Sequence, residues 1–241
     1  MIDLSQQALA IVFARTGDGS PLLAAVLTAG WFLLLYAVMA GGAFLLLDRL
    51  AAAPINARPL RTGQVRSEIA GSLRSIGVFA AQAAAVWWLL DRGWLAVSWD
   101  VGPARWALEV CSLWLWNEVH FYATHRLLHW RPLFLRVHAV HHRSVRVTPL
   151  AAFNFHWIEA FLLGAVMPLA LCAHAFSPWA LLCLPALSLA WNVLGHSNWR
   201  PRSPAGWLRR ASEQHAAHHA RAHGNYGFAL SCFDRWLGTR L

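Results

Sequence analysis

The chain of 241 residues contains no lysine and few charged residues of any kind. Only 13% of its residues are charged, against about 25% in a typical soluble domain, and 58% are hydrophobic. The net charge of +9 is carried by arginine as the only strong cation. This composition excludes an ordinary soluble domain and indicates an integral membrane protein. Because the arginines flank apolar segments and form no single basic element, we do not expect nucleic acid binding.

The sequence also lacks the motifs that hold common redox cofactors. Its 4 cysteines form no CxxC pair, and neither a CxxCH haem site nor a GxGxxG nucleotide motif occurs. Three of the cysteines lie in apolar stretches, which favours buried thiols over disulfides or metal ligands. Any redox chemistry would therefore need electrons from a separate cytochrome, ferredoxin or reductase.

Long apolar segments predict membrane helices. Residues 21–47 carry no charge and exceed the roughly 20 residues that cross a bilayer. A second segment, 69–90, has a short uncharged part after Arg74, which we expect to snorkel. Before them, the N-terminal residues predict a short amphipathic helix at the interface, capped by Asp3 or Ser5.

The second half of the chain predicts a polar-faced helix and a hairpin. The helix begins near residue 105 and carries Glu109, Asn117 and Glu118. Residues 158–173 and 179–193 are apolar but short for a full crossing, so a hairpin that enters the membrane and returns is plausible. The predicted fold is an all-α integral membrane bundle of about four transmembrane or re-entrant helices.

Arginine density predicts the orientation of this bundle. Arginines concentrate at 49–74, 126–146 and 200–221, and the loop at 91–105 carries few. The positive-inside rule then places the first loop and the C-terminal tail in the cytoplasm. We expect a cytoplasmic histidine-rich helical cap, in a bacterial inner membrane or an equivalent membrane.

Histidines recur in this cap with helical spacing. Of the 13 histidines, His125 and His129 are four apart, and two HxxHH triplets follow. The triplets are His138, His141 and His142, and His215, His218 and His219. Since residues three and four apart share a helix face, each group predicts two or three imidazoles that point in one direction. Imidazole binds Zn, Fe, Cu and Ni, and eight nitrogens exceed one four-coordinate site, so two metal ions are expected.

A structural role fits the single histidines better than it fits the groups. His174 lies between apolar residues and is expected to be a polar residue of the core or an interface, and His120 is expected either to be structural or to support the ligands. A His-rich tract is sometimes a loose metal-binding tail. The groups here extend from 125 to 219 and alternate with apolar segments, which favours a folded site.

Six pieces in order resemble the fatty acid hydroxylase superfamily, the sterol-desaturase-like integral membrane oxygenases with a dimetal, usually di-iron, centre. The pieces are FYATHRLLH, RVHAVHHRS, FHWIE, LGHSN, HAAHH with NYG, and FDRWLGT, and together they cover about 118–239. The resemblance divides the chain into 1–100, with the interfacial segment and two transmembrane helices, and 101–241, a catalytic domain similar to this family.

The resemblance implies a set of metal ligands. These are His125, His129, His138, His141, His142, His215, His218 and His219, which would form the catalytic centre, and His196 of GHSN as a further ligand.

Four more residues have two interpretations each. His156 and Glu159 match a family HPxE segment and would support the ligands, or His156 would cap an interfacial helix. Glu118 stands where the family usually has Asp, in a supporting or structural role. His223 is four residues after His219, but Gly224 is expected to end that helix first.

The function that the resemblance implies is hydroxylation or desaturation of a lipid with O2 and external electrons. The native cofactor would be two iron ions, with Zn as a possible substitute that lacks redox chemistry. Sterol, fatty acyl, sphingoid, ether lipid and carotenoid substrates are all compatible. Two alternatives stay open: a non-catalytic membrane metal-binding protein or transporter, and a membrane zinc hydrolase.

Overall fold

The structure is a computed structural model that describes residues 4–15, 19–50, 54–200 and 206–241. The described residues are helical and form no strand. The α-helices are α1 (Leu4–Val12), α2 (Pro21–Leu35), α3 (Gly42–Leu50), α4 (Gln64–Asp91), α5 (Pro103–Leu128), α6 (Arg131–Leu133), α7 (Ala139–His142), α8 (Trp157–Gly164), α9 (Val166–Ala173), α10 (Pro178–Gly195), α11 (Gly206–Arg221) and α12 (Cys232–Trp236). Two π-helical segments, Tyr36–Gly41 and Phe134–His138, and a 3-10 helix, Pro149–Phe153, complete the set.

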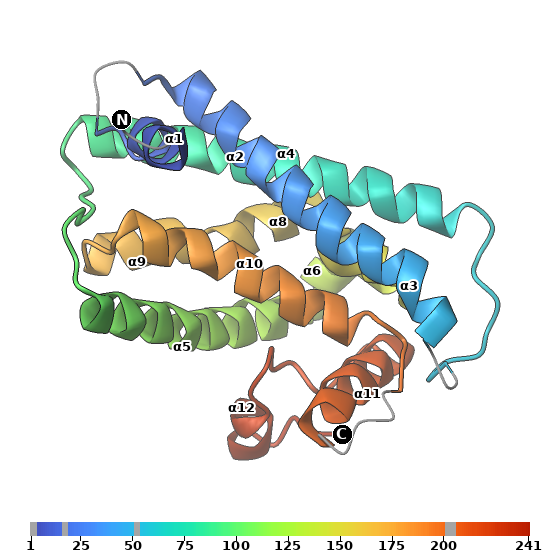
Figure 1. The fold of residues 1–241 in the computed structure, drawn as a ribbon. Helices are drawn as coiled ribbons and strands as arrows, with labels where there is room; N and C mark the ends of the chain where they lie inside the picture. The colour runs from blue at the N-terminus through green and yellow to red at the C-terminus, as the bar shows by residue number, and fades with distance from the viewer. Residues whose placement is uncertain (1–3, 16–18, 51–53, 201–205) are drawn as a thin grey trace.

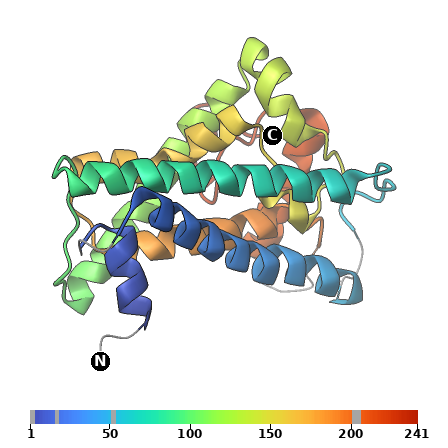
Figure 2. The ribbon, with the colours of Figure 1, turned by 90° about the horizontal axis from the view of Figure 1, so that it is seen from above.

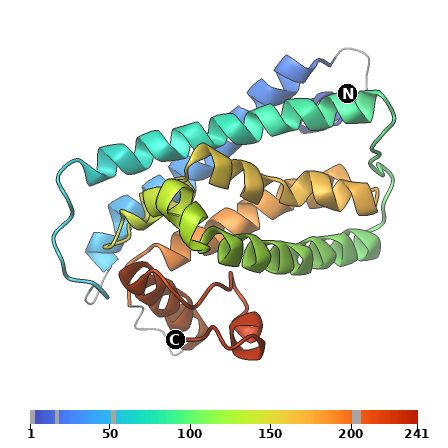
Figure 3. The ribbon, with the colours of Figure 1, turned by 180° about the vertical axis from the view of Figure 1, so that it is seen from behind.

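The long helices lie roughly along one common axis, with α4 running opposite to α2, α5 and α10, and they stack in layers (Figure 1). Helices α2 and α4 cross on one side, α5 forms the other side, and α8, α9 and α10 lie between them. The view from above shows α2 crossing α4 at a small angle (Figure 2), and the view from behind shows α8 and α9 between α4 and α5 (Figure 3). Helices α11 and α12 lie at one end of the bundle, where α10 ends.

The predicted membrane bundle is confirmed. Three helical stretches are long and apolar enough to cross a membrane, namely Pro21–Leu47, Gln64–Asp91 and Pro178–Gly195. The pair α8–α9, Trp157–Ala173, is a shorter apolar stretch. Large apolar side chains on the outside of the first stretch, such as Leu22 and Val38, are exposed, as expected of a surface that faces lipid.

The expectation of buried thiols is wrong for two of the cysteines. Cys111 and Cys172 are exposed, whereas Cys183 and Cys232 are partly buried, and all four are free. An apolar stretch of a membrane protein can point its side chains at lipid as well as at the core. Apolar neighbours in the sequence therefore did not decide which thiols lie inside the fold.

Helix boundaries follow from capping residues. Ser20 and Ser177 accept hydrogen bonds from the backbone N–H of Leu23 and Ala180, and each precedes a proline in the first turn. The second predicted segment begins at Gln64, five residues earlier than expected, because the polar residues before the apolar run continue on the same helix. The chain from the first to the second span therefore enters α4 with Glu68 already inside the fold.

The core holds the chain after the second histidine group against α2 and α4. Phe153 packs against Phe32, Tyr36 and Phe79, with ring centroids 5.5–6.2 Å apart. The carbonyl oxygen of Leu150 accepts hydrogen bonds from the hydroxyl of Tyr36 at 2.8 Å and of Ser72 at 3.0 Å. These contacts fix the segment that leads from the histidine cap back into the bundle.

Candidate metal centre

The first two histidine groups follow each other along a nearly continuous helical path. Helix α5 carries His125 in its last turn, and His129 caps its C-terminus. The chain then turns through α6, a π-helical segment that ends at His138, and the short α7 with His141 and His142. The turn brings His138 and His142 opposite the end of α5, where they meet His125 and His129.

Nine histidines gather into two buried groups. The first contains His125, His129, His138, His142 and His218, and the second contains His141, His196, His215 and His219. Within each group, one ligand atom from every residue lies within 4.8 Å of all the others. Every ligand that the resemblance implied is therefore brought into one of the two groups.

The spacing predicts that two or three imidazoles of each triplet point in one direction, and in the structure two of the three share a group. His138 and His142, one turn apart on the π-segment and α7, enter the first group, whereas His141 enters the second. The C-terminal triplet is divided in the opposite sense, since His215 and His219 enter the second group and His218 enters the first. Each triplet thus contributes to both groups, because its middle member points about 60–100° away from the other two on a helix of 3.6 residues per turn.

In the group of His141, His196, His215 and His219, the Nε2 atoms lie close together. The distance is 3.2 Å from His196 to His141, 3.0 Å from His215 to His196, and 3.1 Å from His219 to His215. Nitrogens that each bind a common ion at about 2.1 Å lie roughly 3.0–3.4 Å apart. The spacing of these four atoms matches that arrangement.

Acceptors on the opposite ring nitrogens fix which nitrogen carries the proton. Backbone carbonyls lie against Nδ1 of His125 (Tyr226), His141 (Asn154), His196 (Asn192) and His218 (Gly224), at 2.6–3.3 Å. A carbonyl accepts and cannot donate, so these Nδ1 atoms carry the hydrogen and each Nε2 keeps a lone pair. The lone pairs on Nε2 of His141 and His196 then face each other without a proton between them.

Such facing lone pairs repel unless a cation lies between them, and this is how the residues fit a metal. Among the described residues, the buried Nε2 atoms of His129 and His218 have no hydrogen-bond partner. A buried polar atom without a partner destabilises a fold, whereas ligation satisfies it. The two groups of five and four imidazoles would therefore hold two metal ions.

Burial keeps these imidazoles neutral. It lowers the pKa of His129 to about 3 and the pKa of His196 and of His218 to about 4, with repulsion between neighbouring imidazoles adding to the shift. Burial also lowers the pKa of His141 and His219 well below the ordinary value. Neutral imidazole is the form that ligates a metal, so the site is ready for metal at neutral pH.

Of the four supporting candidates, only Glu159 contacts the histidines. Its carboxylate accepts a hydrogen bond from His138 Nδ1 at 2.8 Å, and both side chains are buried. His156 instead takes the second of its two expected roles and caps α8, where its Nδ1 accepts from the N–H of Ile158. His223 is exposed and belongs to neither group, because α11 ends at Arg221.

Glu118 has the structural role. Its carboxylate accepts hydrogen bonds from the backbone N–H of Ala229 and Leu230 at 2.9–3.1 Å, and so ties the C-terminal segment to α5. Asp234 accepts from the N–H of Tyr226 and Gly227, both at 2.8 Å. A Cβ at Gly227 would lie 2.7 Å from Asp234 Oδ2, so this turn requires glycine. The turn presents the Tyr226 carbonyl to His125.

The family of this chain follows from its sequence over the same region. Residues 110–239, which contain all nine histidines, match the fatty acid hydroxylase family. The chain belongs to this family. The match begins inside α5 and ends at the segment that Asp234 holds, so it covers the histidine cap and the helices that carry it.

Several curated proteins are similar to this chain in sequence. The Delta(7)-sterol 5(6)-desaturase ERG3A of Gibberella zeae is 26% identical over 181 residues, 73% of this chain and 51% of that protein. Lathosterol oxidase of Homo sapiens is 26% identical over 185 residues, 73% and 61% of the two chains. Methylsterol monooxygenase 1 of Rattus norvegicus is 28% identical over 129 residues, 51% and 43%. The chain spans about half the length of these relatives, and no solved structure matches it.

A further carboxylate, that of Glu68, supports the histidine cap, and the sequence pattern did not predict it. Glu68 of α4 is fully buried and accepts hydrogen bonds from Gln64 Nε2 and Ser144 Oγ, each at 2.7 Å, and from Thr148 Oγ1. Gln64 also donates to the carbonyl of Arg146 at 2.8 Å. The network anchors the loop that follows His142. An acidic residue at the start of a membrane helix was the signal that could have found it.

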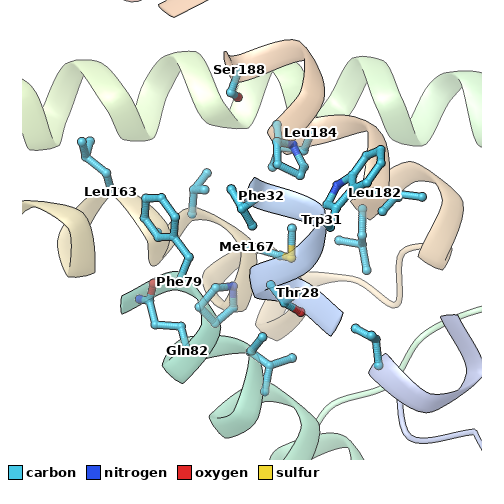
Figure 4. A pocket seen from close by; sticks show the side chains of 18 of the residues that line it. Thr28, Trp31, Phe32, Phe79, Gln82, Leu163, Met167, Leu182, Leu184 and Ser188 are labelled. Atoms are coloured by element: carbon cyan, nitrogen blue, oxygen red, sulfur yellow. The ribbon is translucent and has the colours of Figure 1, made fainter. Parts of the chain in front are cut away.

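An apolar cavity of about 500 Å³ lies among the helices of the bundle, and Figure 4 shows part of its lining. Helices α1, α2, α4, α5, α8, α9 and α10 line it, largely with aliphatic and aromatic side chains. Phe121 and Phe155 form part of its wall and touch the rings of His125 and His141, with centroids 5.1 Å apart in each case. Phe228 packs on Phe121 at 4.6 Å. The cavity therefore ends at aromatic rings that contact both histidine groups.

Proposed function

We propose that this chain is a membrane-bound di-iron oxygenase that hydroxylates or desaturates a lipid with O2 and electrons from an external donor. The nine clustered imidazoles, seven of them buried, beside an apolar cavity carry this proposal. Its relatives named as sterol desaturase, methylsterol monooxygenase and lathosterol oxidase support a lipid substrate and favour a sterol among the candidate classes. Two irons, when bound, would supply the oxidising power that an unactivated C–H bond requires.

The residues of the chain hold and shield this chemistry. The Nδ1 acceptors orient the histidines before any ion arrives, and Glu159 does the same for His138 with a negative charge. Phe121 and Phe155 bring aromatic rings of the cavity wall against His125 and His141, and Phe228 packs on Phe121. A lipid in the cavity would bring its C–H bonds to this aromatic end.

The two reactions share the same reactants. In hydroxylation, a C–H bond becomes C–O–H, one oxygen atom of O2 enters the product, and the other leaves as water with two electrons and two protons. In desaturation, two C–H bonds are lost, a C=C bond forms, and both oxygen atoms leave as water with the same two electrons and two protons. The electrons come from a separate cytochrome, ferredoxin or reductase in either case.

Arginines support a cytoplasmic position for the histidine cap. Exposed arginines such as Arg126, Arg131 and Arg143 surround it, and the positive-inside rule favours the cytoplasmic side for such a surface. The division into 1–100 and 101–241 and the placement in a bacterial inner membrane stay predictions. The relatives named above come from eukaryotes and give no support to the bacterial membrane.

The deciding experiment is metal stoichiometry with a product search. The chain is purified in mild detergent from its native host, iron and zinc are counted per chain, and host lipids with and without the gene are compared by mass spectrometry. We expect about two irons per chain and a lipid that gains one oxygen or loses two hydrogens. Two zincs with no changed lipid would favour a zinc hydrolase, and a folded chain without stoichiometric metal would contradict the proposal.

A further inference from the structure

Polar side chains interrupt the apolar lining of the cavity on several helices, among them Thr28 and Trp31 on α2 and Gln82 on α4. Four polar side chains line it from two helices that pack against each other, Asn117 and His120 on α5 and Ser188 and Asn192 on α10. The members of each pair are three or four residues apart and so share a helix face. The α2 wall contributes mostly apolar side chains, such as Leu27, Phe32 and Leu34.

Two of these polar side chains, on α5 and α10, have an atom that lacks a partner. Within the part of the chain that the structure describes, Asn117 Nδ2 and Ser188 Oγ are buried and make no hydrogen bond, and the same holds for Trp31 Nε1 and Gln82 Oε1 on the other side of the cavity. Asn117 is 7% exposed, so its amide is almost wholly enclosed. A polar residue in a membrane helix usually bonds across to a neighbouring helix, and a buried polar atom left without a bond is costly. Asn117 Nδ2 and Ser188 Oγ are therefore explained better by a bound ligand than by helix packing.

Both atoms lie at the same depth relative to the metal centre. Helices α5 and α10 run in the same direction towards the histidines (Figure 1). Asn117 stands eight residues before His125, and Ser188 eight residues before His196, which is about 12 Å along each helix axis. A hydrogen-bonding group of a lipid would meet both atoms at one level, about one helical turn from Phe121 at the aromatic end of the cavity.

We propose that Asn117 and Ser188 form a polar subsite that selects a lipid carrying a hydroxyl or carbonyl oxygen. An amide N–H donates to such an oxygen, and a serine hydroxyl donates or accepts. A site built to bond an oxygen rejects the analogue that lacks it, because its own polar atoms are then left unpaired. The substrate is thus a lipid that already bears oxygen, and a plain hydrocarbon chain is excluded. That the bound lipid is the substrate rests on the proposed function, whereas the preference for a lipid that bears oxygen does not.

The test is a binding competition read by mass. The full-length chain in mild detergent receives equimolar hexadecan-1-ol and hexadecane, and native mass spectrometry counts the chains that carry each. Metal content is measured in parallel, so a missing metal contradicts the proposed function without affecting the preference. We expect the alcohol to be preferred at least about tenfold, as selective hydrogen bonding predicts.

Matched variants locate the preference. In Asn117→Leu/Ser188→Ala the preference should fall about tenfold, to near parity, because the alcohol loses its partners. In Thr28→Val, which removes a hydroxyl from the α2 wall of the same cavity, the preference should stay (Figure 4 shows Thr28 and Ser188 on their separate helices). Thermal unfolding separates a structural role. The ligand-free double variant should unfold no lower than the native chain, since Asn117 Nδ2 and Ser188 Oγ had no partner among the described residues.

Two results would overturn the inference. One is equal binding of alcohol and hydrocarbon by the native chain, or no binding of either. The other is a preference that the double variant retains in full, which would place the recognition elsewhere in the cavity. A double variant that unfolds at a markedly lower temperature would also count against a ligand subsite, because it would assign both side chains to the fold.

Discussion

Two glutamate–histidine pairs lie at different ends of the bundle and share little beyond composition. At the metal centre, Glu159 and His138 are 2.8 Å apart and each is 1% exposed. At the far end, Glu109 Oε1 lies 3.5 Å from His174 Nε2, and the His174 side chain is 50% exposed. Glu109 also accepts from Arg105 Nε at 2.9 Å and from the backbone N–H of Ser177.

The difference shows what burial does to the same chemical pair. The far pair has an arginine, a backbone donor and nearby solvent, so its carboxylate is satisfied whatever His174 does. The Glu159 carboxylate has His138 as its hydrogen-bond partner, and its other oxygen makes no hydrogen bond within the described residues. A carboxylate buried so deeply is costly unless a positive charge lies near. An ion held by His138 Nε2 would supply that charge through the ring.

The largest expected effect is the loss of metal when a ligand histidine is removed, with a histidine at the far end of the bundle as the control. His141→Ala and His218→Ala each remove a ligand from one histidine group, so we expect loss of stoichiometric metal and of product together. His174→Ala, the matched control at the far end, should change neither. Metal analysis and product detection on the three purified variants check this, and full activity in either ligand variant would contradict the dimetal centre.

The next effect concerns acid. Burial lowers the pKa of His196 and His218 to about 4 in the folded, metal-free chain, below the ordinary value of 6.5 that the unfolded chain has. The unfolded state then binds protons first, so stability is lost as pH falls through 6.5 and continues to fall until about pH 4. Between pH 7.5 and 5.5 each such histidine should cost about 1.4 kcal/mol.

Thermal unfolding in detergent, after metal removal with a chelator, measures this loss. The metal-loaded chain should resist acid over the same range until its ligands are protonated and the metal leaves. A metal-free chain that is equally stable at pH 7.5 and 5.5 would show that the imidazoles are more accessible to water than their burial indicates.

A smaller effect comes from the charges of the two carboxylates. Glu159→Gln keeps an oxygen that accepts from His138 but loses the negative charge, so metal affinity should fall about 10–100-fold. Glu109→Gln makes the same change at the far end and should leave metal affinity unaltered. Competition with a chelator of known affinity compares the two variants, and equal affinities would remove Glu159 from the support of the centre.

Local spacing predicted which histidines meet, and the reason is geometric. His138 and His142 converge, as do His215 and His219, because residues four apart lie on one side of a helix. The division of each triplet between two groups could not be predicted, because it depends on where α5, α10 and α11 pack around these histidines. The cap role of His156 and the network of Glu68 also depend on contacts that the sequence pattern does not show.

The smallest expected effect is a change in stability when Glu109, at the far end of the bundle, loses one of its partners. Arg105→Ala removes the charged partner of Glu109, but the Arg105 side chain is 46% exposed, and such surface ion pairs contribute about 0.2–1 kcal/mol. The N–H of Ser177 still donates to the carboxylate at 2.8 Å, so we expect the unfolding temperature to fall only slightly and the metal content to stay. Thermal unfolding with metal analysis measures both. A large loss of stability would mean that Glu109 depends on Arg105 as Glu159 depends on the metal centre, and the contrast between the two ends would then lie in the partner and not in the exposure to solvent.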